Sequence, residues 1–365
     1  MSTPCFAPEE VADRLLPRQR HPYYIVAPNY IQVSAGIKAL HMLCHALNHA
    51  GQTAYLVIHP FYPRPEQATH PYLLTPLLDA TRLQRHFDDG MCPITLYPET
   101  VHGNPFGAPL VVRYLLNFPG LLGGDATFPP EEICIAYSER IAQASPNVAS
   151  TLFLPTSDPA LFTPEPPQPR TGSCFYAAKY QEVHGGELFE ATRDSVEITR
   201  LRHDSQTPEQ IAELFRRCEL FYCYENSALI IEALLCGCPV VMLPNPYLER
   251  SIGEGEIGWD GIAWGTEAAE IARAKATIGR ARANYLACFP RFEEQLRQFI
   301  VLTQQCAAAR PYAHLLDIPH LHQPGRLSRI AGSWELTRSM AAVRGIVPTI
   351  RAGLMRIARG WLKHF

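Results

Sequence analysis

Apolar residues occur along this chain in short unbroken runs and in longer segments where they recur every three or four positions. The run at 21–26 predicts a buried strand, and the segment 37–50, which Gly51 ends, predicts a helix. The run at 53–58 predicts the next strand. Because a strand, a helix and a strand within ~40 residues require a right-handed crossover, we expect a parallel sheet.

The first layer is predicted to continue well beyond residue 58. The stretch 155–171 then holds six prolines and no periodic pattern, so we interpret it as a linker. A first α/β domain is therefore expected at 1–160. Its further strands are predicted by the apolar runs at 94–97, 110–114, 132–137 and 151–154.

A second α/β domain is expected at 161–310. Its helix at 207–217 has the clearest start, because Thr207 can cap it and Gln210 completes a capping box. Pro290 is expected to interrupt the helical pattern at 288–291. The other expected elements are strands at 174–178, 196–201, 220–224 and 239–243, and helices at 185–192, 227–236, 267–287 and 292–308.

Length and composition agree with two globular domains. The chain has 365 residues, of which 47% are hydrophobic and 18% charged, which excludes a disordered chain. The net charge of −3 argues against a nucleic-acid-binding protein with a basic surface. Eleven cysteines without framework-like spacing, and a first segment without an apolar leader, predict reduced thiols and a cytoplasmic protein.

Residues 311–365 are expected to form a separate tail. From 326 to 365 there are eight Lys or Arg residues and one acidic residue, a charge of +7 that leaves about −10 for the rest of the chain. Apolar residues from Ile350 to Phe365 fall on one helical face, with arginines beside it. We expect a basic amphipathic helix that holds the protein peripherally on the anionic inner face of a membrane. A helix packed on its own first domain is the alternative.

The segment 221–245 contains the most informative chemistry. A predicted strand ends at Tyr224, a polar turn follows, and a helix then begins, so that free amides face the strand ends. Helix N-termini at that edge of a parallel sheet bind phosphate groups. Glu232 lies about one and a half turns further along, within reach of a ribose. In the alternative interpretation, Asn226 or Ser227 caps the helix and Glu232 makes a surface contact.

This segment resembles the nucleotide-sugar motif of GT-B glycosyltransferases, in which a polar turn and a Ser or Thr precede a helix of the form (I/S)-x-E-A-x-x-x-G-x-P-V-V. The resemblance implies two Rossmann-like domains that face each other across a cleft. It also implies a nucleotide sugar as substrate on the second domain, with no cofactor and no metal. The matching residues are Ser227, Glu232, Ala233, Gly237, Pro239, Val240 and Val241.

The resemblance assigns roles on the donor side. Asn226 and Ser227 become contacts of the diphosphate, and Glu232 becomes the ligand of the ribose. Glu225 lies seven residues before Glu232, where the family has two glutamates eight apart. Lys179 resembles the cation that stabilises the departing diphosphate, although an ordinary exposed lysine is the alternative. Arg113 and Arg193 are weaker candidates for that cation.

Candidates in the first domain are less specific. Gly36 closes a loop of small residues (33–36) like the one that lets ligands approach the backbone in this family, and a simple helix entry is the alternative. A general base for the acceptor hydroxyl is sought among loop residues, with His102 preferred because histidine accepts a proton near neutral pH. The other loop candidates are Asp125, Asp88 and Asp89.

Three other patterns are interpreted as structural. His41, His45 and His49 recur every four residues as zinc ligands do, but their apolar neighbours favour a helix border. Cys236 and Cys238 flank a predicted helix end and act as small hydrophobes. The glycine-rich stretch 253–261 is acidic and lacks the lysine of a phosphate-binding loop.

We therefore expect a glycosyltransferase that moves a sugar from a nucleotide-sugar donor to a glycan or lipid-linked acceptor in bacterial surface polysaccharide synthesis. A sugar-nucleotide epimerase of the same fold and a non-catalytic nucleotide-binding module are the alternatives. A nicotinamide-dependent oxidoreductase is disfavoured, because no GxGxxG follows the first strand.

Overall fold

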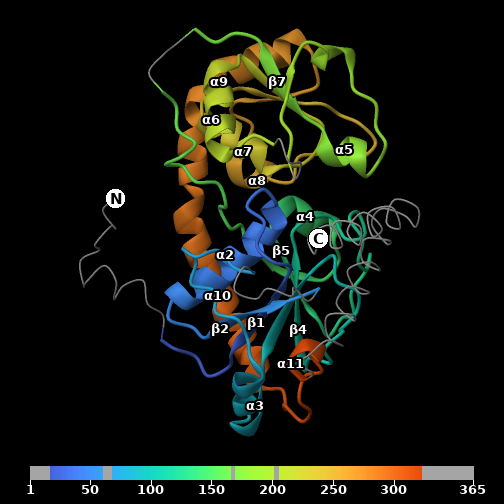
Figure 1. Ribbon diagram of the computed structural model, residues 1–365, viewed down its shortest axis with the longest axis vertical. Coiled ribbons are helices and arrows are strands. Elements are labelled where there is room, and N and C mark those ends of the chain that lie inside the picture. The colour runs from blue at the N-terminus through green and yellow to red at the C-terminus, as the bar shows by residue number, and fades with distance from the viewer. Residues whose placement is uncertain (1–16, 61–67, 166–168, 201–204, 323–365) are drawn as a thin grey trace, which may run out of the picture. The chain divides into compact units, whose positions relative to one another are not determined.

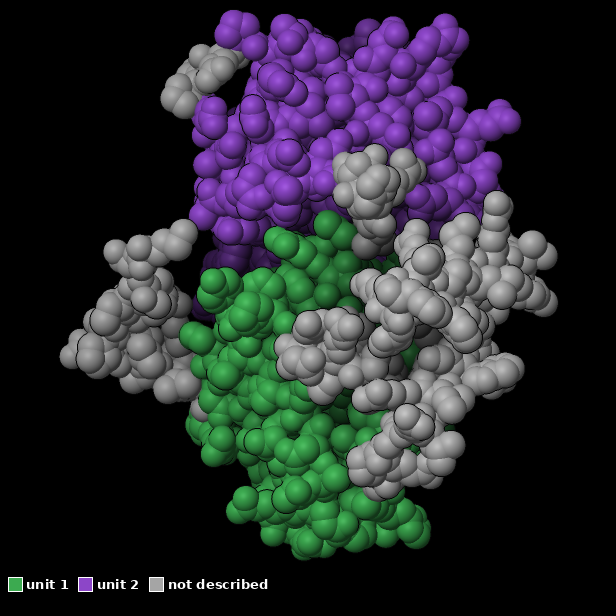
Figure 2. Space-filling view, in the orientation of Figure 1, with its two compact units in different colours: residues 1–137, 145–152, 294–365 green, residues 138–144, 153–293 purple. Residues whose placement is uncertain are grey.

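The computed structural model describes residues 17–60, 68–165, 169–200 and 205–322 (Figure 1). The chain forms two compact units, coloured separately in Figure 2. Unit 1 comprises the described parts of 1–137, 145–152 and 294–365, and unit 2 those of 138–144 and 153–293. The sequence predicts domain boundaries at 160 and 310, whereas in the structure the chain passes between the two units after residues 137, 144, 152 and 293. Of the separate tail expected at 311–365, residues 311–322 instead group with unit 1, where Leu316 and Ile318 are buried in the core, and the basic part at 326–365 lies outside the described residues.

Unit 1 is built on a six-stranded sheet with the order β2-β1-β3-β4-β5-β6, in which every pairing is parallel. Every residue of β1, β3 and β4 is buried, as expected for parallel strands covered on both faces. The strands are β1 (Tyr23–Ala27), β2 (Ala54–Ile58), β3 (Ile94–Pro98), β4 (Leu110–Leu115), β5 (Ile133–Ala136) and β6 (Val148–Thr151), and the helices along this part of the chain are α2 (Ala35–His49), α3 (Ala80–Asp88), α4 (Glu139–Ala144, which groups with unit 2) and α11 (Pro319–His322).

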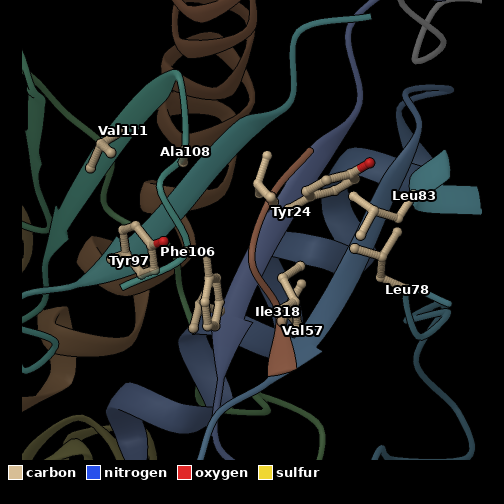
Figure 3. Packing of buried hydrophobic residues seen from close by; sticks show 11 residues of the cluster. Tyr24, Val57, Leu78, Leu83, Tyr97, Phe106, Ala108, Val111 and Ile318 are labelled. Atoms are coloured by element: carbon tan, nitrogen blue, oxygen red, sulfur yellow. The ribbon is translucent and has the colours of Figure 1, made fainter. Parts of the chain in front are cut away.

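Two connections in unit 1 contain no helix. Residues 99–109 join β3 to β4, and residues 116–132 join β4 to β5, both in extended or turn conformation. Phe106 and Ala108 of the first connection are buried in one cluster with Tyr97 and Val111 of the strands beneath them (Figure 3). The connection therefore covers the sheet face that a crossover helix would otherwise cover.

Unit 2 has a five-stranded parallel sheet with the order β11-β10-β9-β7-β8. Two parallel α/β units of this kind fit a two-domain GT-B fold. The strands are β7 (Ser173–Tyr176), β8 (Val196–Glu197), β9 (Leu220–Cys223), β10 (Val240–Met242) and β11 (Ile262–Trp264), and the helices are α5 (Ala178–Glu182), η2 (Glu190–Thr192), α6 (Pro208–Arg217), α7 (Ala228–Leu235), α8 (Glu254–Ile257), α9 (Ala268–Leu286) and α10 (Cys288–Ala308, which groups with unit 1 from residue 294 onward).

Most predicted elements of unit 2 are confirmed, and two predictions are wrong. The capping box of Thr207 and Gln210 is present at α6. The helix expected at 185–192 is wrong. The helix α5 lies directly after β7, Gly185 has φ +67, outside the right-handed helical region, and within that range only the short 3₁₀ helix η2 forms. The helical pattern is interrupted as expected, but the break falls at Ala287, between α9 and α10, and not at 288–291. Pro290 lies in the first turn of α10, a position that tolerates proline.

In unit 1, the predicted strands and the helix at 37–50 are confirmed with ends shifted by no more than two residues, except for β6 (Val148–Thr151), which lies three residues earlier than the strand predicted at 151–154 and shares only Thr151 with it. Within the described part of the chain, no helix combines the length and apolar character that crossing a membrane requires.

Candidate functional site

In unit 2, the strand ends of the sheet meet the start of α7. Ser227 precedes the helix in an extended conformation, and its Oγ accepts a hydrogen bond from Leu229 N at 3.3 Å. The amide of Asn226 bonds through both atoms to the segment after β10, because Nδ2 donates to Arg250 O and Oδ1 accepts from Ile252 N, each at 3.0 Å. The predicted helix start therefore lies at the carboxyl edge of the sheet, and Asn226 holds a neighbouring loop there.

Glu225 and Lys179, which follow different strands, are brought together at the same edge. Oε2 of Glu225 accepts hydrogen bonds from Lys179 N at 2.6 Å and Tyr180 N at 3.0 Å. Oε1 lies 3.9 Å from Lys179 Nζ, whose side chain is 44% exposed. Burial raises the pKa of Glu225, although the Lys179 charge and the two amide hydrogen bonds oppose that shift. Lys179 thus presents a half-exposed cation beside a buried carboxyl group.

Glu232 forms a buried ion pair that the sequence interpretation missed. Its Oε2 lies 3.1 Å from Nη2 of Arg200, and the two side chains are only 5% and 8% exposed. The guanidinium of Arg200 also lies 5.7 Å from the centre of the Tyr176 ring. Arg200 comes three residues after β8, although the sequence predicts a strand at 196–201 that would include it, so no sequence signal pointed to this residue. The role of Glu232 as ribose ligand stays a prediction.

In unit 1, the structure pairs the two predicted catalytic candidates. Nδ1 of His102 lies 2.9 Å from Oδ1 of Asp125, and Oδ2 accepts the Gly103 N–H at 2.7 Å. The His102 side chain is 65% exposed. Burial raises the pKa of Asp125, but the hydrogen bonds from Gly103 and His102 outweigh it and hold that pKa below its usual value. With Nδ1 donating to this carboxylate, Nε2 is the ring atom that can accept a proton.

The pair depends on a close approach of two backbone segments. Gly124, next to Asp125, has φ +80, and a Cβ there would fall on the Glu99 carbonyl oxygen and lie 2.8 Å from Thr100 Cα. Glycine therefore lets the connection 116–132 lie directly against the connection that holds His102.

The other first-domain candidates are placed differently. Gly36 lies in the first turn of α2, where a Cβ would make an ordinary 3.7 Å contact with Leu116 Cδ1, so packing does not require glycine. Asp88 and Asp89 end α3, which leads into the amino end of β3, away from the connection that follows that strand. Arg113 is fully buried, so its guanidinium is not presented to a diphosphate.

The helical histidines make protein contacts. Nε2 of His41 lies 2.9 Å from Pro28 O, and Nδ1 of His45 accepts the Leu74 N–H at 2.9 Å. Among the described residues, no group of three or more His, Cys, Asp or Glu side chains is arranged to hold a metal ion.

Comparison with known proteins gives structural neighbours alone. No family model matches the sequence, and no curated protein does. The chain is similar to AviGT4, a glycosyltransferase involved in avilamycin A biosynthesis, at 13% identity and a TM-score of 0.46 over 79% of this chain and 98% of that one. It is also similar to the glycosyltransferase SnogD from Streptomyces nogalater, at 13% identity and a TM-score of 0.40 over 78% and 100%.

A third neighbour is MurG from Acinetobacter baumannii, at 11% identity and a TM-score of 0.30 over 73% of this chain and 95% of that one. All three scores lie below 0.5, so the function has to be argued from the residues of this chain.

Proposed function

We propose that the protein is a glycosyltransferase that uses a nucleotide-sugar donor. The observation that carries this proposal is the segment β9-α7-β10, in which the motif residues Ser227 and Glu232 lie on a helix that starts at the carboxyl edge of a parallel sheet. Ligands of open α/β sheets bind at that edge, and phosphate groups bind at helix starts. Lys179 lies there as well, through its contact with Glu225.

On the donor side, the diphosphate is proposed to lie at the start of α7, between the Ser227 hydroxyl and Lys179 Nζ. Both groups, together with the helix dipole, favour the negative charge that grows as the nucleoside diphosphate departs, without a metal ion. Glu232 is proposed to accept hydrogen bonds from the ribose hydroxyls, with Arg200 holding its carboxylate in place. In this arrangement Asn226 supports the turn through the loop at 250–252.

On the acceptor side, Nε2 of His102 is proposed to take the proton of the acceptor hydroxyl. That oxygen forms a bond to the anomeric carbon while the bond from this carbon to the diphosphate oxygen breaks, and the electron pair leaves with the nucleoside diphosphate. Asp125 keeps Nδ1 protonated and stabilises the imidazolium. A single displacement of this kind inverts the anomeric configuration.

The acceptor is proposed to be a glycan or lipid-linked glycan of bacterial surface polysaccharide synthesis, reached at the inner face of the membrane. The support is the charge of +7 in residues 326–365, which suits anionic lipid headgroups. Deletion of 326–365 should move the protein from vesicles of anionic lipid to the supernatant, and unchanged sedimentation would contradict membrane binding.

A thermal-shift panel of UDP, GDP, dTDP, ADP and CMP tests the donor site. One nucleoside diphosphate should stabilise the protein, and Glu232→Ala should abolish that shift, because a hydrogen bond to a charged group is worth ~1.5 to 3 kcal/mol. Glu219→Ala is the matched control: Glu219 pairs with Lys275 at 3.3 Å and stands at the amino end of β9, so the shift should remain.

Turnover then separates the enzyme from its alternatives. With the identified donor and an acceptor glycan, release of nucleoside diphosphate should depend on acceptor. Isomerisation of the donor without acceptor would identify an epimerase instead, and binding without any turnover would identify a nucleotide-binding module.

A further inference from the structure

Arg113 is the largest fully buried side chain among the described residues, and it lies in the middle of β4. Its Nε bonds to Glu132 Oε2 at 2.6 Å and Nη2 to Glu132 Oε1 at 3.2 Å. Nη1 donates to Val101 O at 2.7 Å, and Nη2 also donates to Gly103 O. The guanidinium therefore binds the backbone on both sides of His102.

The partners of Arg113 come from both connections that lack a helix. Val101 and Gly103 belong to the connection 99–109, and Glu132 ends the connection 116–132. The rings of Tyr97 and Phe128 each lie 5.1 Å from the guanidinium carbon. Neither connection has helical hydrogen bonds of its own, and this one side chain links both of them to β4.

A buried charge is costly unless it is fully paired, and apolar residues would cover this face of the sheet at lower cost. The hydrogen bonds from Arg113 to the carbonyl groups of Val101 and Gly103 restrict the backbone conformation of His102, which lies between them. Gly103 in turn donates its N–H to Asp125, so the guanidinium and the Asp125 carboxylate both bond to the backbone of this one residue, next to His102. The Arg113 charge also contributes to the lowered pKa of Asp125.

We propose that Arg113 is a positioning residue for proton transfer. Its buried guanidinium holds residues 101–103 so that His102 stays bonded to Asp125 and directs Nε2 outward. This inference rests on the proposed function, since it assigns His102 the role of base. Arg113 touches neither donor nor acceptor and acts on the reaction through His102 alone.

The test compares arginines that bridge the same two segments. Arg113→Gln removes the guanidinium that bonds to the backbone beside His102. Arg310→Gln removes a guanidinium that donates to Pro109 O and Glu131 O, each at 2.9 Å, at the amino ends of β4 and β5. The double variant Arg113→Met/Glu132→Met replaces the ion pair by apolar side chains, which proteins often tolerate without loss of stability. This variant keeps the test decisive if Arg113→Gln does not fold.

Two readouts are measured on each folded variant. The first is the Nδ1–H signal of ¹⁵N-labelled His102, assigned with a His102→Ala sample, which reports the bond to Asp125. The second is the kinetics of transfer. We expect the Arg113 variants to lose the Nδ1–H signal and to lower kcat at least ~10-fold, with the donor KM within about 2-fold. Arg310→Gln should change neither.

The outcomes separate this inference from the proposed function. If the double variant folds and retains the His102 signal and kcat, or if Arg310→Gln lowers kcat as much, the positioning role is overturned while the transferase stands. If the wild-type protein turns over no nucleotide sugar, the proposed function fails. The Nδ1–H signal of the Arg113 variants then still decides whether Arg113 holds His102 against Asp125. An unchanged signal overturns the positioning role.

Discussion

The two candidate sites are built in different ways. In unit 2, the donor-side residues follow strand ends and start helices, and the two acidic residues are buried against partners of opposite charge, Glu225 beside Lys179 and Glu232 beside Arg200. In unit 1, His102 and Asp125 lie on connections without helices and remain partly exposed. The proposed donor surface is thus made from regular elements, whereas the proposed proton-transfer pair lies on irregular connections that the buried side chain of Arg113 contacts.

The largest expected effect belongs to the exposed pair. His102→Ala should lower the rate of transfer by ~10²- to 10⁴-fold, the usual contribution of a positioned general base, and leave the nucleotide-induced thermal shift unchanged. Initial rates with saturating donor measure this effect. His49→Ala, at an exposed histidine of α2, should keep the wild-type rate. A His102→Ala enzyme with full activity would remove unit 1 from the chemistry.

The next largest effect is expected from a change at the contact between Gly124 and the Glu99 backbone, beside the His102–Asp125 pair. Gly124→Ala places a Cβ on the Glu99 carbonyl and should lower the free energy of unfolding by about 2 to 4 kcal/mol, measured by urea denaturation. Gly107→Ala in the neighbouring connection also has a positive φ, +63, but nothing within 4 Å, so only the backbone strain of about 1 kcal/mol is expected. Equal losses in the Gly124→Ala and Gly107→Ala variants would contradict the close approach of Gly124 to the Glu99 backbone.

On the donor side, Glu225→Gln should tighten binding of the nucleoside diphosphate by roughly 3- to 10-fold in calorimetry. The substitution removes a negative charge next to Lys179 while an amide oxygen can still accept the Lys179 and Tyr180 N–H groups. Weaker binding would mean that Glu225 itself contacts the ligand.

The same variant makes a prediction about pH. Because burial raises the pKa of Glu225 in the folded state, the wild-type protein loses stability as the pH rises through that raised pKa. The Glu225→Gln variant lacks this carboxyl group and should not show this loss. Its free energy of unfolding relative to wild type should therefore rise between pH 4 and pH 7 in denaturation experiments.

The smallest effect is expected for Asp125→Asn. Since the folded-state pKa of Asp125 is lowered, its carboxylate contributes stability above the ordinary carboxyl pKa and loses that contribution as the pH falls through the lowered value. The substitution should cost about 0.5 to 1 kcal/mol at pH 7, and that cost should shrink as the pH falls through the lowered pKa. An equal cost at low pH would show that the carboxylate charge plays no part.

The features that the sequence predicts well are local. Thr207 and Gln210 of α6, and Ser227 at α7, are recognised because caps act over three residues of chain. Arg200 and Glu232 are 32 residues apart, and His102 and Asp125 are 23 apart, so no spacing rule pairs them. The wrong helix at 185–192 shows the same limit, because the positive φ of Gly185, +67, and the close fit of Gly186 against the ring of Tyr180 arise only in the folded chain.

Glu225 also has a consequence for the order in which unit 2 can assemble. Helix α5 follows Ala177, which offers no capping side chain, and the acceptor for its first amides comes from a residue 46 positions later. During synthesis on the ribosome, this short helix therefore leaves the exit tunnel before its cap exists. It gains that cap only once β9 has been made and has paired with β7, so the late strand completes the early helix.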